Sequence, residues 1–248
     1  IRMIESPQQR LCSNTFMPRV TLKNLGAQPL TSVKIHAVVE NGNQVQQAWE
    51  GHLAHGAEIQ VELPAMTVPE GDFILKAFTE LPNGVPDEEP SNDTEFEAFM
   101  YYLPIEANIQ EGFENEYPAK GWDIINADNS YTWEKTMSAS YSGSSSIRIR
   151  NSINTTIGTK DALRSPDFRI AAVDSAFVTF QLAASNYSVG NRTQSTWDTL
   201  EVFISTDCGL TRTRVYKKWG GQLATTSATS RTAFIPSAEQ WRSEKINI

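Results

Sequence analysis

Alternation of apolar and polar residues runs through most of the chain and limits its fold more than any other feature. In residues 18–80, and again in residues 121–248, β-branched and aromatic residues occupy every second position of short runs separated by turn-forming residues. A period of two is that of half-buried β-strands, whereas a surface helix repeats every 3.6 residues. The sequence therefore predicts an all-β protein.

The spacing of these runs divides the chain into two predicted domains. Short strands at hairpin spacing in residues 1–103 indicate a small immunoglobulin-like β-sandwich, with Asn41-Gly42 as a hairpin turn and Trp49 as a core anchor. The runs in residues 104–248 indicate a larger jelly-roll-like sandwich, and the long apolar run 175–185 is expected to cross the middle of a sheet.

Two short segments bear on how these domains begin and end. Residues 103–106 contain a proline that interrupts strand pairing, and they are expected to link the two domains. Residues 246–248 alternate as a strand, but no turn or polar tail follows them. An unpaired edge strand promotes aggregation, so we expect the closing strands of the jelly roll to come from a longer parent protein or from a separate segment.

Charge and cysteine content exclude several classes of function. The net charge of −8 opposes a nucleic-acid partner, because a phosphate backbone is bound mainly by Lys and Arg. No apolar run is long enough to span a bilayer. The two cysteines, Cys12 and Cys208, rule out a disulfide scaffold and a CxxC site. We expect two separate, mostly buried thiols, with a bridge between them as the alternative.

Catalytic patterns are missing from the sequence. The three histidines, His36, His52 and His55, do not have a metalloprotease spacing and are expected at the surface or at strand ends. There is no GxSxG elbow, and the serine-rich residues 142–146 are interpreted as a turn. A glycosidase would need two facing carboxylates, for which Glu134 and Glu201 are compatible only in their strand alternation.

Residues 205–211 match the Ser-x-Asp-x-Gly-x-Thr pattern of the Asp-box turn. In this turn the Asp side chain accepts hydrogen bonds from the backbone of a tight hairpin connection. A single copy predicts that two strands are joined here, which is a folding role.

A calcium site is the strongest chemical prediction from the residues themselves. Calcium prefers six to eight oxygen ligands from carboxylates, Asn side chains and backbone carbonyls. Such oxygens occur near predicted strand ends, at Glu114, Asn126, Asp128, Asn129 and Asp198. The alternative is that these residues are ordinary turn formers, because Asn and Asp favour turns for backbone reasons alone.

Several motifs occur along each predicted domain. Those of the second domain are Glu111-Gly-Phe-Glu114, Gly121-Trp122, Asn126-Ala-Asp128, Tyr131-Thr-Trp133, residues 142–147, residues 163–168, residues 197–209 and Trp241. With these motifs the second domain resembles the jelly-roll modules called cleaved-adhesin or choice-of-anchor domains, which are relatives of the MAM domain.

The motifs of the first domain are Leu11-Cys12, residues 18–26, residues 30–33, residues 49–51 and Asn92-Asp93. With these motifs the first domain resembles the immunoglobulin-like adhesion repeats found beside such modules.

Together the pair is similar to the accessory region of secreted, pappalysin-like zinc metalloproteases or adhesins of the Bacteroidetes. The resemblance implies an extracellular or cell-surface module stabilised by Ca²⁺, with the catalytic domain elsewhere in the parent chain. It also implies that Glu114, Asp128 and Asp198 are calcium ligands. The usual final strands of the family are absent from this sequence, so any ligand in them is absent too.

Two classes of function follow from these observations. The first is a non-catalytic module that binds an extracellular protein or polysaccharide, or that acts as a spacer for the catalytic domain. Exposed aromatic side chains would mark a binding surface, because rings stack on sugars. The candidate residues for this aromatic surface are Tyr131, Trp133, Tyr187 and Trp219. The second class of function is a jelly-roll glycosidase or a carbohydrate-binding module.

Overall fold

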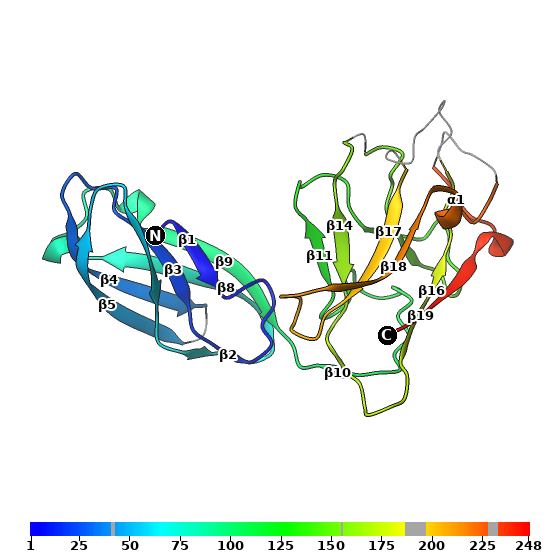
Figure 1. The fold of residues 1–248 in the computed structure, drawn as a ribbon, viewed down its shortest axis with the longest axis horizontal. Coiled ribbons are helices and arrows are strands. Elements are labelled where there is room, and N and C mark those ends of the chain that lie inside the picture. Colours follow the sequence, from blue (N-terminus) through cyan, green and yellow to red (C-terminus); the bar gives the residue numbers. More distant parts are fainter. Residues whose placement is uncertain (41–42, 155, 187–196, 228–232) are drawn as a thin grey trace. The chain divides into compact units, whose positions relative to one another are not determined.

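The structure, a computed structural model, describes residues 1–40, 43–154, 156–186, 197–227 and 233–248. The chain divides into two compact units, a first unit of Ile1–Leu103 and a second unit of Pro104–Ile248. In the described residues nearly all regular structure is β-strand, and most of the pairings are antiparallel, which confirms the all-β prediction (Figure 1).

The first unit is a sandwich of two main sheets. A four-stranded sheet has the order β5-β4-β8-β9, a three-stranded sheet has the order β1-β3-β6, and β2 pairs with β7. The strands are β1 (Met3–Ser6), β2 (Thr15–Phe16), β3 (Arg19–Lys23), β4 (Leu30–Val39), β5 (Gln44–Leu53), β6 (Glu58–Glu62), β7 (Met66–Thr67), β8 (Gly71–Glu80) and β9 (Thr94–Tyr101), with 3-10 turns at Pro82–Gly84 and Pro90–Asn92.

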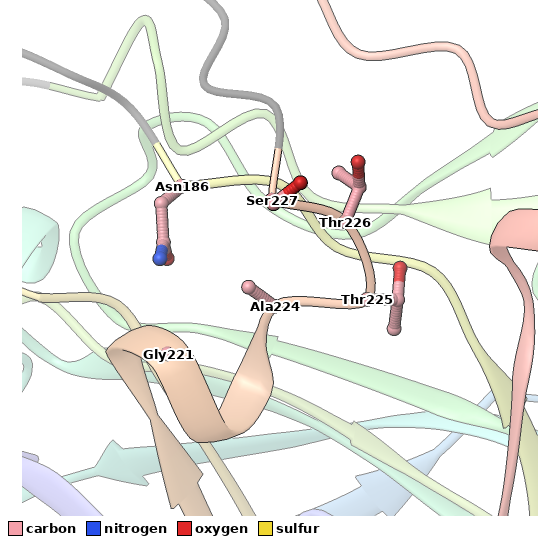
Figure 2. Close-up of a pocket in the computed structure, with 6 residues that line it drawn as sticks. All are labelled: Asn186, Gly221, Ala224, Thr225, Thr226 and Ser227. Atoms are coloured by element: carbon pink, nitrogen blue, oxygen red, sulfur yellow. The ribbon is translucent and has the colours of Figure 1, made fainter.

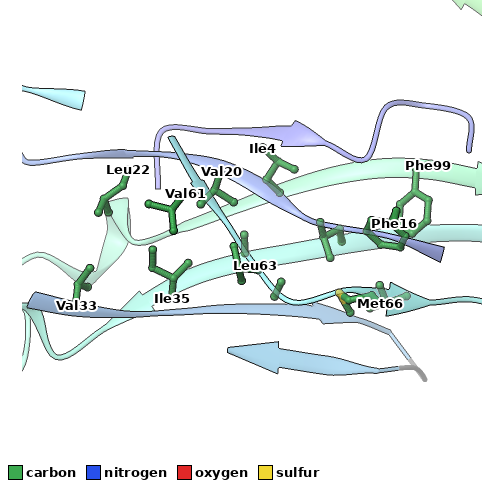
Figure 3. Close-up of a cluster of buried hydrophobic side chains, with 14 of the residues drawn as sticks. Ile4, Phe16, Val20, Leu22, Val33, Ile35, Val61, Leu63, Met66 and Phe99 are labelled. Atoms are coloured by element: carbon green, nitrogen blue, oxygen red, sulfur yellow. The ribbon is translucent and has the colours of Figure 1, made fainter. Parts of the chain in front are cut away.

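The core of the first unit lies between these sheets. Figure 3 shows Val20 and Val61 on one side of the core and Val33 and Ile35 on the other. Alternation along β4 explains the choice, because Val33, Ile35 and Ala37 are buried while the neighbouring Lys34 is exposed. The two-residue period thus determines which of these side chains are buried.

Two details of the first unit differ from expectation. Trp49 is only partly buried and packs against the core from β5, an edge strand of the four-stranded sheet. His36 is buried rather than exposed, because its ring stacks on Phe78 at a centroid distance of 4.8 Å. The prediction of surface or strand-end histidines is therefore wrong for His36. The predicted turn Asn41-Gly42 lies outside the described residues.

The second unit is built from strand pairs. Its described strands form five separate two-stranded sheets, of which only β10–β15 is parallel. The strands are β10 (Ile105–Glu106), β11 (Asp123–Asn126), β12 (Glu134–Thr136), β13 (Ser146–Arg148), β14 (Asp161–Arg164), β15 (Phe168–Arg169), β16 (Phe177–Leu182), β17 (Thr199–Ile204), β18 (Thr213–Trp219) and β19 (Arg242–Asn247), with a one-turn helix α1 (Gly220–Leu223) and a 3-10 turn at Ala238–Gln240.

Three expectations for this part of the chain are corrected. The apolar run 175–185 contains β16, which pairs with β19 alone among the described strands, so within the described residues it lies in a two-stranded sheet and not in the middle of a larger one. Residues Ile105–Glu106 are not free linker, because they pair with β15. Both cysteines are disulfide-bonded, so the prediction of two separate thiols is wrong.

No helix in the described part of the chain is both long and apolar enough to cross a bilayer.

Candidate functional site

Glu114, the first predicted calcium ligand, caps a turn. Its carboxylate accepts hydrogen bonds from Ser144 Oγ at 2.6 Å, Ser144 N at 3.0 Å and Ser145 N at 3.1 Å. These donors lower the pKa of Glu114, the Ser144 side chain most strongly, because they stabilise the charged form. The serine-rich turn predicted from the sequence thus provides the hydrogen-bond donors for this carboxylate.

Gly143 makes the approach of Glu114 geometrically feasible. It adopts a φ of 67°, and a Cβ atom at this position would overlap the Glu114 carboxylate. On the other side of the segment, Lys135 Nζ donates to the backbone carbonyls of Glu114 at 2.8 Å and Asn115 at 2.6 Å. Glu114 therefore clamps two distant stretches of the second unit together.

The apolar anchors beside Glu114 also meet. The Phe113 and Trp122 rings pack edge to face with centroids 5.4 Å apart, and Phe113 contacts Tyr117 at 6.4 Å. Burial raises the pKa of the Tyr117 hydroxyl to about 12, with Glu134 adding to the effect. The Phe-Glu and Gly-Trp motifs thus form one local packing unit.

The end of β11 and the loop that follows it contain the next two predicted ligands, Asn126 and Asp128. Asn126 Nδ2 donates to the Ser130 carbonyl at 2.8 Å, and Asp128 Oδ1 accepts from Ser130 N at 3.0 Å. Asp128 is exposed and acts as a local turn former here, whereas Asn126 is half-buried. The two residues shape the same loop.

Asp198, the last predicted ligand, lies just before β17 and is exposed. Its backbone carbonyl accepts a hydrogen bond from Gly220 N at 3.4 Å. Among the described residues, no group of three or more His, Cys, Asp or Glu side chains is placed to hold a metal ion. The set of Glu114, Asn126, Asp128 and Asp198 stays a prediction.

The Asp-box turn has the hydrogen bonds that its sequence predicts. Asp207 Oδ1 accepts from Thr211 N at 2.8 Å, Asp207 Oδ2 accepts from Thr211 Oγ1 at 2.6 Å, and Ser205 Oγ accepts from Gly209 N at 2.8 Å. The hydrogen bond from Thr211 is the main reason that the pKa of Asp207 falls to about 2. The turn joins β17 to β18 and is confirmed as a folding element.

The two carboxylates considered for glycosidase chemistry are each paired with cations. Glu134 forms ion pairs of 2.7 Å with both Arg148 and Arg150. Glu201 lies 2.9 Å from Arg214 and 3.2 Å from Lys217. Burial alone would raise the pKa of Glu201, but hydrogen bonds from these two cations lower it overall. A glycosidase acid needs the opposite shift.

The aromatic surface candidates differ in exposure. Tyr131 is 48% exposed and lies 5.9 Å from the Arg150 guanidinium, while the partly exposed Trp219 lies 5.7 Å from Lys217 Nζ. Trp133 is half-buried and its indole Nε1 donates to the Asp161 carbonyl at 3.4 Å. Tyr187 lies outside the described residues.

A hollow of about 410 Å³ lies beside α1 (Figure 2). Its wall is fixed where Thr225 and Ala184 exchange hydrogen bonds, with Thr225 N donating to the Ala184 carbonyl at 2.8 Å and Ala184 N donating to Thr225 Oγ1 at 3.0 Å. The lining residues are Asn186, Gly221, Ala224, Thr225, Thr226 and Ser227.

Comparisons with known proteins add two distant solved structures. No family model matches the chain, and no curated protein matches it. The chain is similar to the CARDB domain of the PF1109 protein from Pyrococcus furiosus in complex with di-metal ions, with a TM-score of 0.33 and 22% identity over 40% of this chain and 84% of that one. A solution NMR structure of the same domain gives 0.32 and 22% over 40% and 89%. The all-β class rests on the chain's own strand pairing.

Proposed function

We propose that this chain is a non-catalytic, calcium-stabilised pair of β-sandwich domains that binds an extracellular protein or a polysaccharide. In this proposal it belongs to a larger secreted or cell-surface protein, and a zinc metalloprotease domain lies elsewhere in that protein. The sequence resemblance to adhesion repeats and cleaved-adhesin modules supports this proposal, as does the all-β architecture. If this chain binds no ligand, its remaining role in the proposal is that of a spacer that positions the catalytic domain.

One observation carries the non-catalytic part of the proposal. The carboxylates in the second unit that sequence reasoning singled out for catalysis are engaged in structural pairs, Glu134 with two arginines and Glu201 with Arg214 and Lys217. An acid catalyst must be free to reach its substrate and must hold its proton near neutral pH, whereas Glu134 is engaged by two arginines and the pKa of Glu201 is lowered. These residues therefore suit structure better than proton transfer.

The best-supported contact surface is around Tyr131. Its ring is nearly half exposed, and the Arg150 guanidinium over it adds a charged donor beside an apolar face. An exposed ring next to an arginine suits a sugar ring, which offers C–H groups to the aromatic face and hydroxyls to the cation. A polysaccharide or the glycan of a glycoprotein is the ligand that fits this chemistry.

The second candidate function has two forms, a glycosidase and a carbohydrate-binding module. One observation favours the carbohydrate-binding module. The hollow beside α1 is lined mainly by hydroxyl, amide and backbone groups, with the Ala224 methyl group among them, and its volume lies within the range of small-molecule sites. The glycosidase form of this alternative is disfavoured by the lowered pKa of Glu201.

A binding screen tests the proposal directly. The 248-residue chain would be screened against polysaccharides and extracellular-matrix proteins, with Tyr131→Ala compared with Phe96→Ala, an exposed aromatic of the first unit. We expect binding that Tyr131→Ala weakens about tenfold and Phe96→Ala leaves unchanged, since loss of one stacked ring costs about 1–3 kcal/mol in comparable stacking contacts.

Parallel glycosidase and peptidase assays on the same chain should show no turnover. Turnover that depends on Glu134 or Glu201 would replace the binding proposal with the enzyme alternative. No binding to any ligand class, together with no turnover, would leave the spacer role.

A further inference from the structure

Five side-chain oxygens in the second unit are buried and have no hydrogen-bond partner among the described residues. Two are the hydroxyls of Tyr117 and Tyr216, and the other three are Asn126 Oδ1, Thr132 Oγ1 and Asp161 Oδ1. An unpartnered polar atom removed from water is costly, and proteins satisfy such atoms with a protein group, an ordered water or an ion. The last three atoms belong to one region of the structure, as the β11–β14 pairing and the hydrogen bonds of the loop after β11 indicate.

The β11–β14 ladder brings two of these residues together. β11 and β14 lie side by side in Figure 1, and Asn126 is directly opposite Asp161 at the end of their antiparallel register. Directly opposed residues of antiparallel strands point to the same face, with Cβ atoms about 5 Å apart. The Asn126 and Asp161 side chains therefore project side by side, on the same face as Ile124 and Leu163.

The loop after β11 places Thr132 beside this pair. Ser130 is fixed to Asn126, because its carbonyl accepts from Asn126 Nδ2 at 2.8 Å. Trp133 is fixed to Asp161, because its indole Nε1 donates to the Asp161 carbonyl at 3.4 Å. Thr132 lies between these two attachments, so its buried Oγ1 belongs to the same corner.

The carboxylate in this corner has no ion-pair partner among the described residues. Asn126 Oδ1 and an ionised Asp161 are both acceptors, and neither can donate to the other. Asp161 forms no ion pair with a described residue. The nearest arginine on β14, Arg164, pairs instead with Asp123, three positions away on the opposite face of the ladder. A cation would satisfy both the oxygens and the charge.

We propose that the end of the β11–β14 ladder is a calcium site held by Asp161, Asn126 and Thr132. An oxygen-only set of one carboxylate, one amide and one hydroxyl suits a hard cation, and backbone carbonyls or water would complete its shell. With a single carboxylate the dissociation constant should be on the order of 10⁻⁴ to 10⁻³ M, as in extracellular modules.

This inference rests on the proposed calcium-stabilised function and assigns the ion to different residues. Of the ligands predicted from the sequence it retains only Asn126, and Glu114 and Asp198 have no part in it. Asp161 was not singled out by sequence reasoning, because it stands alone among Lys160 and apolar neighbours and only the strand register brings it to Asn126.

Thermal melting of the whole chain with Ca²⁺, with Mg²⁺ and with EDTA tests the site at matched ionic strength. Tryptophan fluorescence follows the second unit, which contains every tryptophan except Trp49. We expect calcium at ten times the dissociation constant to raise the melting temperature by about 4 °C, since it binds only the folded state. Mg²⁺ should raise it less, because Mg²⁺ sheds its water reluctantly.

Substitutions locate the ion. Asp161→Asn removes the only charged ligand with little change of shape, and it should abolish the calcium-dependent shift. Asn126→Asp places a second carboxylate opposite the first, so it should lower the melting temperature in EDTA and enlarge the calcium shift. Glu114→Gln and Asp198→Asn are the matched controls and should keep the wild-type shift.

Terbium luminescence gives a second readout at the same place. Tb³⁺ substitutes for Ca²⁺ and emits when it is excited through a nearby indole. The indole of Trp133 is close, because it donates a hydrogen bond to the backbone carbonyl of Asp161. We expect sensitised emission that Ca²⁺ competes away, and that both Asp161→Asn and Trp133→Phe reduce several-fold.

The outcomes separate the alternatives. A calcium shift kept in Asp161→Asn but lost in Glu114→Gln or Asp198→Asn would overturn this inference and favour the set predicted from the sequence. No shift in the wild type, with Asn126→Asp unstable at every calcium concentration, would mean that only a water fills the corner. Neither result would affect the ligand screen, which tests the binding function separately.

Discussion

The two units of this protein reach stability by different means. Of the buried hydrophobic side chains among the described residues, only Ile246 lies in the second unit; the others form the core of the first. The first unit has sheets of four and three strands that cover each other, whereas the described strands of the second unit occur in pairs. Most strand residues of the second unit are only half-buried, and a two-stranded sheet is at best marginally stable on its own.

Polar connections are correspondingly prominent in the second unit. Glu114 holds the turn at Ser144 and Ser145, Asp207 holds the Asp-box, and Glu244 accepts from Lys218 and Arg242 at 2.8 Å. Hydrogen-bonded carboxylates fix geometry but contribute less than apolar burial, since each replaces bonds to water. The comparison indicates a first unit stabilised by its core and a second unit stabilised by specific contacts, including the proposed ion.

The largest expected effect separates the two units by their cores. Leu75→Ala empties a fully buried site in β8 and should destabilise the first unit by about 4 kcal/mol, whereas Leu163→Ala in the half-buried β14 should cost about 2 kcal/mol. Urea denaturation followed by circular dichroism would measure both. Equal costs would show that the second unit has a core as closed as the first.

A smaller effect is expected at the buried carboxylate of the second unit. Glu244 is 7% exposed, and Glu244→Gln leaves Lys218 and Arg242 without their shared partner, so we expect a loss of about 3 kcal/mol. Burial tends to raise the pKa of Glu244, but hydrogen bonds from Lys218 and Arg242 lower it overall. The contribution should therefore be complete above the ordinary glutamate pKa and be lost as the pH falls through the lowered value.

Glu239→Gln is the matched variant. The Glu239 carboxylate lies in the same unit and contacts Ser237 at the surface, so this variant should change the free energy of unfolding by less than about 0.5 kcal/mol. If the two variants unfold alike in urea followed by tryptophan fluorescence, the polar cluster does not stabilise the second unit.

Gly143 tests the clamp made by Glu114. Gly143→Ala strains a backbone with a φ of 67° and forces the new methyl group against the carboxylate, so a loss of about 2 kcal/mol is expected. Gly158→Ala is the control, because Gly158 also has a positive φ, of 90°, but nothing lies near the added atom, so about 1 kcal/mol should be lost. Thermal melting of both variants would measure the difference. Equal losses would show that the Glu114 carboxylate does not restrict the backbone at Gly143.

The smallest effect concerns the exposed Asp-box. The pKa of Asp207 is about 2 in the folded chain, below the ordinary value of 3.8, so its folded-state hydrogen bonds add stability above about pH 4. This contribution should be lost as the pH falls from about 4 toward 2. Melting temperatures of Asp207→Asn and the wild type should therefore converge in that interval. A constant difference between them would contradict the lowered pKa.

The predictable parts of the site are those in which neighbours in sequence are also neighbours in space. The Asp-box was predictable from residues 205–211, since donor and acceptor lie four positions apart. The meeting of Phe113 with Trp122 was foreseeable from closely spaced motifs. The partners of Glu114 were not, because Ser144 lies 30 positions away. Asp161 escaped notice for the same reason, since only the β11–β14 register places it opposite Asn126.

The amino-acid sequence by itself determined the strand character of this chain, because a two-residue period is a local property that side-chain burial reinforces along each strand. It also determined the Asp-box turn and the oxygen-rich loop after β11. The tertiary structure alone decided which carboxylates are bound by serines, arginines or lysines, and which buried oxygens have no hydrogen-bond partner among the described residues. Those facts depend on strand register and on turns between distant segments, which a shift of a single residue would change while leaving the alternation of each strand intact.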